Sequence, residues 1–171
     1  MDLKPRCRWC GNDPLLISYH DDEWGCYAAA DEESRDFEKM TLEIFQAGLS
    51  WRTILHKREQ FRLAFDGFDV NAIAAYDSAK IEQLLQNAGI VRNRKKIEAV
   101  IANAQQVILL RQQYGSFAKY LTQLPVDNPT YLCREFKSRF RFMGPTVTES
   151  FLQTVGKLPV VHESQCWLYK G

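Results

Sequence analysis

The spacing of apolar residues along most of this chain is that of helices. From Arg92 to Tyr114 they recur every three or four positions, which places them on one face of a long helix. That face is formed by Ile97, Val100, Ile101, Ala104, Ile108 and Leu109. No segment shows the strict alternation of a strand, and no repeat or low-complexity segment interrupts the pattern. The sequence therefore predicts an all-α fold, a multi-helix bundle.

Start and stop residues divide the rest of the chain into further helices. Ser50 is placed to cap a helix, and glycine or proline follows several of the apolar patterns. The expected helices cover residues 36–47, 50–65, 69–76, 77–88, 116–124, and two segments between 130 and 156 that are separated at Phe142–Pro145. We interpret residues 1–171 as a single domain, since this length suits one core better than two.

Charge and cysteine content narrow the function classes. The net charge is +1, which argues weakly against a DNA-binding protein that relies on overall basicity. Two local basic runs, residues 92–96 and 134–141, are typical of solvated helix faces. The five cysteines are an odd number, and no export signal or membrane span is evident, so we expect a cytoplasmic protein with reduced thiols.

Both ends of the chain carry cysteine and histidine. In VVHESQC, His162 and Cys166 are four residues apart, and one helical turn would direct both at the same point. The N-terminal segment offers Cys7, Cys10 and His20, and any two of these would complete a tetrahedral zinc set. Four protein ligands leave no open position, which favours a structural zinc over a catalytic one. The alternative is a set of inert core thiols with a hydrogen-bonded histidine.

Aromatic residues gather around one acidic residue in YHDDEWG (19–25) and LEIFQAGLSW (42–51). Glu43 lies at the edge of the apolar face of its expected helix, and Trp24 and Trp51 lie in these segments. Glu43 either reaches solvent from this boundary or is a buried acceptor in an aromatic slot. Such a slot suits a purine, whose faces stack on rings and whose N–H edge donates to an anion. A cationic base would gain further from both contacts.

Four segments, in this order, resemble the bacterial 3-methyladenine DNA glycosylase I family, a branch of the helix-hairpin-helix glycosylases. They are CRW…DPLLISYHDDEWG, LEIFQAGLSWRTILHKRE, AGIVRNRKKIEAVIANA and RFRFMGPTVTESFLQTVG, and the resemblance covers essentially the whole chain. The resemblance implies a structural zinc that joins the two ends of the chain. The implied ligands are Cys7, His20, His162 and Cys166, with Cys10 an alternative to Cys7.

The resemblance also implies how base and DNA are held. Glu43 is implied as the residue that binds the base and supports catalysis, with aromatic contacts from Tyr19, Trp51, Trp9 and Trp24. The loop Gly48–Leu49 is implied to press into the DNA. A helix-hairpin-helix motif over about 131–156 is implied to present backbone N–H groups to a phosphate at Gly144.

The activity implied by the resemblance is hydrolysis of the N-glycosidic bond of 3-methyladenine in alkylated double-stranded DNA. The enzyme would act as a monomer and would not bind a membrane. Free 3-methyladenine would be its product. One position departs from the family, which typically has Asn-Asp before the metal histidine. Here Val160-Val161 stand there, and no carboxylate is present. The alternative function is therefore a protein of the same fold that binds damaged DNA with weak or no cleavage.

Overall fold

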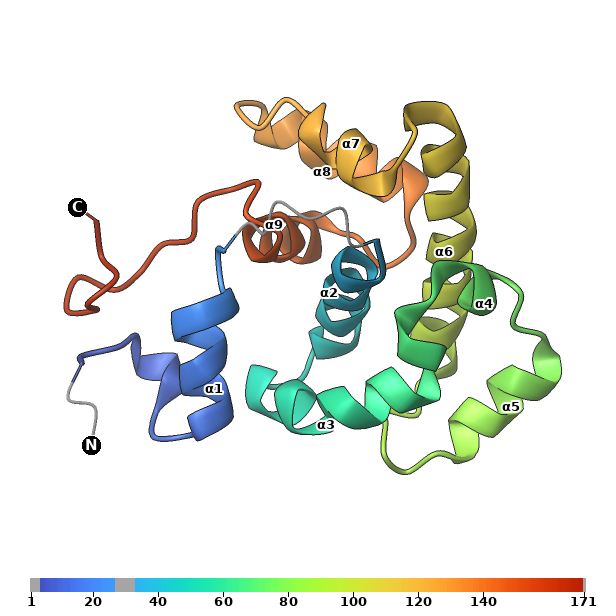
Figure 1. The fold of residues 1–171 in the computed structure, drawn as a ribbon, viewed down its shortest axis with the longest axis horizontal. Helices are drawn as coiled ribbons and strands as arrows, with labels where there is room; N and C mark the ends of the chain where they lie inside the picture. The colour runs from blue at the N-terminus through green and yellow to red at the C-terminus, as the bar shows by residue number, and fades with distance from the viewer. Residues whose placement is uncertain (1–3, 27–32, 171) are drawn as a thin grey trace.

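Helix α2 (Glu33–Gln46) lies at the centre of the fold and is covered on all sides. Every residue from Asp36 to Phe45 is buried, which is the pattern of a helix enclosed by neighbours. The computed structural model describes residues 4–26 and 33–170, and all regular elements in these ranges are helical. The predicted all-α fold is confirmed for this part of the chain (Figure 1).

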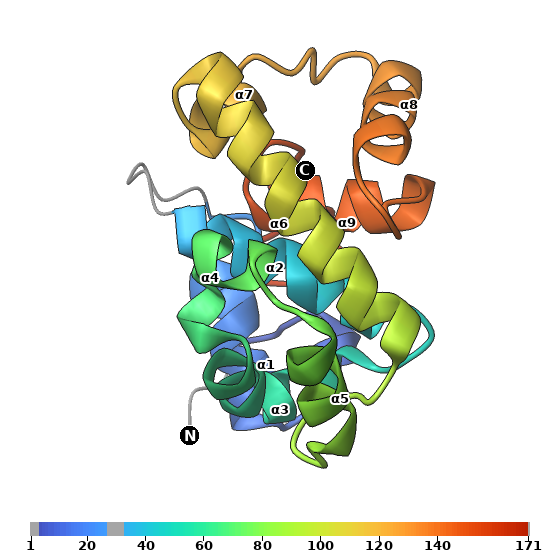
Figure 2. The ribbon, with the colours of Figure 1, turned by 90° about the vertical axis from the view of Figure 1, so that its right-hand side faces the viewer.

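Several of the other helices pack around α2. Helices α3, α4, α6, α7 and α9 contact α2, and α8 packs against α9 (Figures 1 and 2). Their bounds are α1 (Pro14–Ser18), α3 (Trp51–Ala64), α4 (Val70–Ala74), α5 (Ser78–Gln86), α6 (Arg94–Tyr114), α7 (Phe117–Thr122), α8 (Pro129–Arg139) and α9 (Pro145–Thr154). Three short turns complete the order: η1 (Arg8–Cys10), η2 (Tyr19–Glu23) and η3 (Asp66–Phe68). No helix among the described residues is long and apolar enough to cross a membrane.

Polar residues at the helix starts explain most of the boundaries. The Ser50 side chain accepts a hydrogen bond from the backbone N–H of Thr53, so the predicted N-cap of α3 is confirmed. Side chains of Asp69, Asp77, Asn93, Ser116 and Asn128 cap α4 to α8 in the same way. The predicted break between the last two helices is also confirmed, since α8 ends at Arg139 and α9 begins at Pro145.

Three features differ from the sequence-based expectations. The run 92–96 is not wholly solvated, because Lys96 is buried and its Nζ donates to the carbonyls of Phe45 and Ala47. Residues 161–166 are not helical, so the helical His-x3-Cys interpretation is wrong. Helix α1 and the π turn η2 were not expected, because each is only five residues long and too short to show an apolar period.

The segments near the two ends of the chain lie side by side, at the left in Figure 1. The Trp167 backbone N–H donates to the Pro5 carbonyl at 2.8 Å. The Arg8 backbone N–H donates to Glu163 Oε1, also at 2.8 Å. These contacts hold the segment that contains the N-terminal cysteines directly against the C-terminal His-x3-Cys segment.

Candidate functional site

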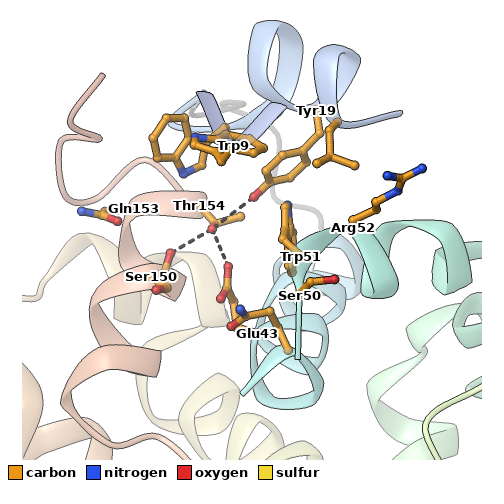
Figure 3. A pocket seen from close by; sticks show the side chains of 12 residues that line it. Trp9, Tyr19, Glu43, Ser50, Trp51, Arg52, Ser150, Gln153 and Thr154 are labelled. Carbon is orange, nitrogen blue, oxygen red and sulfur yellow. Dashed lines mark hydrogen bonds between the residues drawn. The ribbon is translucent and has the colours of Figure 1, made fainter. Parts of the chain in front are cut away.

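A pocket of about 370 Å³ lies where η1, α1 and η2 meet α2, α3 and α9 (Figure 3). Its volume falls in the range of small-molecule sites. Its lining contains five of the residues singled out from the sequence: Trp9, Tyr19, Trp24, Glu43 and Trp51. The lining also contains residues that the sequence analysis missed: Leu16, Gln46, Ser50, Arg52, Ser150, Gln153 and Thr154.

Aromatic rings form one side of this pocket. The Tyr19 and Trp51 rings are 5.1 Å apart and inclined by 60°, and Trp51 is the first residue of α3. The Trp9 ring lies 6.2 Å from Tyr19 and 5.3 Å from Trp24. Tyr19 is buried, and burial raises the pKa of its phenol, which keeps the hydroxyl protonated at neutral pH. The rings supply flat faces and one neutral polar tip to a ligand.

Glu43 is a buried acceptor, the second of the two arrangements considered from the sequence. Its exposed fraction is 6%, although it faces the pocket from α2. Burial raises the pKa of the Glu43 carboxyl to about 7, and a hydrogen bond from Thr154 opposes this rise. A carboxyl group poised between its two charge states at neutral pH is a frequent feature of functional sites.

Thr154, in the last turn of α9, is the residue that the sequence analysis missed and that contacts Glu43 directly. Its Oγ1 lies 3.0 Å from Glu43 Oε1 and 3.5 Å from the Tyr19 hydroxyl (Figure 3). The Lys39 Nζ donates to the Thr154 carbonyl at 2.9 Å. A threonine near the end of an apolar helix resembles many core threonines, so its sequence context gave no signal of this contact.

Cys7, His20, His162 and Cys166 form a second cluster beside the pocket. Their ligand atoms all lie within 4.8 Å of one another. Cys166 Sγ is 3.4 Å from His20 Nε2 and 3.6 Å from His162 Nδ1, and Cys7 Sγ is 3.6 Å from the same His162 nitrogen. Tetrahedral zinc with ordinary Zn–S and Zn–N bonds places sulfur and nitrogen about 3.6 Å apart. This donor set therefore fits a tetrahedral metal ion.

The surroundings of the cluster also fit a metal. His20 Nδ1 lies 2.8 Å from Asp21 Oδ1, which directs the other ring nitrogen toward the sulfur atoms. Backbone N–H groups of Glu163 and Leu168 donate to the sulfur atoms of Cys7 and Cys166. Cys10 is buried in the same region but does not belong to the group of four.

The cluster and the pocket share a wall of indole rings. The Trp24 ring is 5.0 Å from the His162 ring and 5.9 Å from the His20 ring. The Trp9 ring is 5.5 Å from His20. Trp9 and Trp24 also line the pocket, so the same two rings lie against both sites.

The loop between α2 and α3 projects beside the pocket. Gly48 has a φ of +82°, and a Cβ added there would meet nothing, so backbone conformation and not space favours glycine. Leu49 follows it with an exposed fraction of 39%. The residues on either side, Gln46 and Ser50, line the pocket. Lys96 holds the last carbonyls of α2 and thereby the base of this loop.

The turn between α8 and α9 contains a strained residue, Phe142, and ends at Gly144. Phe142 has a φ of +59°, and the buried Asn103 side chain holds the backbone N–H and carbonyl of Arg141. Gly144 is the N-cap of α9, with open space around its Cα and Pro145 as the first helical residue. The opposite end of α9 carries Thr154 into the pocket, so this helix connects the Gly144 turn to the pocket.

The valines that replace the expected Asn-Asp lie outside the pocket. Val161 is 79% exposed and does not line it. Val160 packs against Gly25, where a Cβ would come within 2.6 Å of the Val160 side chain. Neither valine is therefore among the residues that surround Glu43 in the pocket.

Comparisons with known proteins agree with this arrangement. The methyladenine glycosylase family matches residues 9–132. DNA-3-methyladenine glycosylase 1 of Escherichia coli is 37% identical to the chain and is aligned over 97% of both proteins. A crystal structure of a 3-methyladenine DNA glycosylase I superimposes with a TM-score of 0.85 and 37% identity, over 97% of this chain and all of the other.

A structure of the Staphylococcus aureus 3-methyladenine DNA glycosylase I, determined to explain 3-methyladenine recognition, is also similar. Its TM-score is 0.82 at 32% identity, and 95% of each chain is covered. The family match spans more than half of the chain, and the alignments extend over nearly all of it. The chain therefore belongs to the methyladenine glycosylase family.

Proposed function

We propose that this protein extracts 3-methyladenine from alkylated double-stranded DNA, binds the base in the aromatic pocket and reads its edge with Glu43. Membership of the family makes it a 3-methyladenine DNA glycosylase, which hydrolyses the N-glycosidic bond of that base. A nucleotide must leave the duplex before a pocket of this kind can enclose its base. We assign this work to a single domain, residues 1–171, acting as a monomer.

Recognition of the base would combine stacking with a charge contact. The Trp51 ring offers a face, and Tyr19 and the indoles of Trp9 and Trp24 complete the aromatic wall. Alkylation at N3 makes the base cationic within the nucleotide, so it gains both a cation–π contribution and a partner for the Glu43 carboxylate. A neutral purine gains neither, although it fits the same flat space.

The reaction requires little from general acid catalysis. The alkylated base already carries a positive charge, so it leaves with the bonding electron pair and becomes neutral without being protonated. Water adds to the sugar carbon as this bond breaks and gives up a proton, which leaves a sugar hydroxyl. The buried Glu43 carboxylate would stabilise the positive charge of the bound nucleotide through electrostatics.

Two surface features support a role in DNA binding. The exposed Leu49, on the loop held by Lys96, would occupy the space that the extracted nucleotide leaves. The turn at Gly144 would place backbone N–H groups of α9 on a phosphate as the hairpin of a helix-hairpin-helix motif over about 131–156. Neither contact needs a strongly basic protein, in keeping with the net charge of +1.

The four-residue cluster would hold one structural zinc ion. Cys7, His20, His162 and Cys166 supply two sulfur and two nitrogen ligands, which leave no open position for a reacting water. The ion would tie residues near both ends of the chain together and would order the adjacent indole rings.

The buried position of Glu43 in an aromatic pocket carries this proposal, because an isolated carboxyl group is costly to bury unless a ligand makes use of it. The test is release of bases from methylated duplex DNA by the wild type and Glu43→Gln. We expect 3-methyladenine as the main product and a loss of at least about tenfold in Glu43→Gln, since a charge-assisted contact is removed. Equal rates would show that Glu43 does not read the base. Tight lesion binding without any base release would favour a binding protein instead.

A further inference from the structure

Thr154 is the residue of α9 that contacts both Glu43 and Tyr19 in the pocket. It is buried, and its hydroxyl lies between the base-reading Glu43 and the pocket tyrosine (Figure 3). Its backbone carbonyl accepts from the buried Lys39 ammonium at 2.9 Å, so the end of α9 is fixed to α2. The hydroxyl is therefore held at a defined place against Glu43.

The hydroxyl has one hydrogen, and two acceptors lie closer to it than the Tyr19 hydroxyl does. Thr154 Oγ1 lies 2.8 Å from the Ser150 carbonyl and 3.0 Å from Glu43 Oε1. When Glu43 is ionised, Thr154 donates to the carboxylate, because the charge-assisted bond is the stronger of the two. When Glu43 is protonated, its O–H donates to Thr154, which then donates to the Ser150 carbonyl. Both charge states of Glu43 are thus satisfied without a change of side-chain position.

The second carboxyl oxygen of Glu43 remains available to a ligand. Within residues 4–26 and 33–170, the hydrogen bond to Thr154 is the one that the Glu43 side chain makes, and it uses Oε1. We propose that Thr154 is a positioning residue for base recognition, whose hydroxyl holds Oε1 of Glu43 in both charge states and leaves Oε2 to the base. This inference rests on the proposed role of Glu43.

Few charged side chains are placed to influence the charge state of Glu43. Tyr19 of η2 faces Glu43 as a neutral phenol, and Arg52 of α3 lines the pocket with a side chain that is 69% exposed. Lys39 and Lys96 are buried near α2, but their ammonium groups are directed at backbone carbonyls. The residues of α9 that line the pocket carry no charge. The Thr154 hydroxyl is therefore the group best placed to adjust the charge state of Glu43.

The test is the pH profile of 3-methyladenine release for three variants of Thr154. Thr154→Val and Thr154→Ala lack the hydroxyl, and Thr154→Ser retains it. Loss of a hydrogen bond to a charged carboxylate raises its pKa by about one unit, so we expect the acidic limb of kcat/KM to move up by about one pH unit in Val and Ala. In Thr154→Ser the acidic limb should lie at the same pH as in wild type. Thermal unfolding of each variant separates this shift from a loss of folded protein.

A double-mutant cycle with Glu43→Gln provides the second readout. If Thr154 acts through Glu43, Thr154→Val causes no further loss of rate in the Glu43→Gln background. Additive losses, or an unshifted limb in both Thr154→Val and Thr154→Ala, would overturn the inference. In that case a slow Glu43→Gln variant still supports the proposed function, whereas a Glu43→Gln variant as fast as wild type refutes the role of Glu43 itself.

Discussion

Tyr19 and His20 are consecutive in the chain and face two different sites. The Tyr19 hydroxyl lies 3.5 Å from Thr154 Oγ1 in the base pocket, whereas His20 Nε2 lies 3.4 Å from Cys166 Sγ in the cysteine–histidine cluster. The π turn η2 produces this divergence, and its Trp24 N–H donates to the Tyr19 carbonyl at 2.8 Å. Single π turns are often found at functional sites. The order of the cluster therefore affects the geometry of the pocket.

Removal of one cluster ligand tests the metal and this connection together. We expect purified wild type to contain one zinc per chain and Cys166→Ser to contain none. The free energy of unfolding should fall by at least about 3 kcal/mol, because structural zinc contributes folding energy directly. Binding of free 3-methyladenine should weaken as well, since Trp9 and Trp24 lose their support. Elemental analysis, thermal unfolding and calorimetric titration measure the three effects.

Two other cysteines serve as controls for the metal site. Cys133, on α8 outside the cluster, should give a Cys133→Ser variant with full zinc content and stability within about 0.5 kcal/mol of wild type. Cys10→Ala should also retain zinc, although it removes a buried side chain. Wild type without zinc would refute the metal site, and zinc lost in Cys10→Ala would assign Cys10 as a ligand.

The raised pKa of Glu43 predicts a pH-dependent stability. In the folded protein this pKa is about 7, above the ordinary value of 4.5. Between these values the folded state binds more protons than the unfolded state, so this contribution is complete below pH 4.5 and is lost as the pH rises toward 7. The loss amounts to at most about 3 kcal/mol.

Glu43→Gln removes this titration, so its stability should fall less than that of wild type as the pH rises from acidic to mildly alkaline. Chemical unfolding at several pH values measures both slopes. Identical slopes in wild type and variant would contradict a buried, titrating Glu43.

Trp51 is predicted to contribute a stacking face to base binding. Trp51 is the first residue of α3, and its side chain is only partly buried against the core. Replacement by alanine should weaken binding of free 3-methyladenine about 10- to 100-fold, the usual range for one aromatic face under a base. Trp51→Phe should lose less, because a smaller face remains. Calorimetric titration measures both affinities, and unchanged binding by Trp51→Ala would place the base elsewhere in the pocket.

Helix types and positions could be predicted from the sequence because apolar periodicity and caps are local. The long helix α6 and the cap at Ser50 follow directly from these patterns. The spacing of His162 and Cys166 correctly predicted that they lie together, but the helical turn assumed for them is absent. A turn in which the Cys166 N–H donates to the Glu163 carbonyl brings them together, and a turn of this kind has no periodic signature.

Other parts of the site depend on tertiary contacts that no local pattern encodes. Lys96 belongs to a basic run typical of a solvated face, yet it is buried, and its ammonium group donates hydrogen bonds to carbonyls at the end of α2. Thr154 reaches Glu43 from 111 residues away in the sequence. Helix α9 packs against α2 and places Thr154 on Glu43, a contact that the pattern of α2 alone does not encode, so that pattern left two interpretations open.

Leu49 is predicted to act on duplex DNA and not on the free base. Its side chain is 39% exposed and does not line the pocket, so Leu49→Ala should leave stability and binding of free 3-methyladenine unchanged. Release from methylated duplex should slow by about tenfold, because the side chain no longer fills the space of the extracted base. Leu63, a 73% exposed leucine on α3, provides the matched control. If Leu63→Ala slows release from duplex DNA as much as Leu49→Ala, the loop has no specific role in extraction.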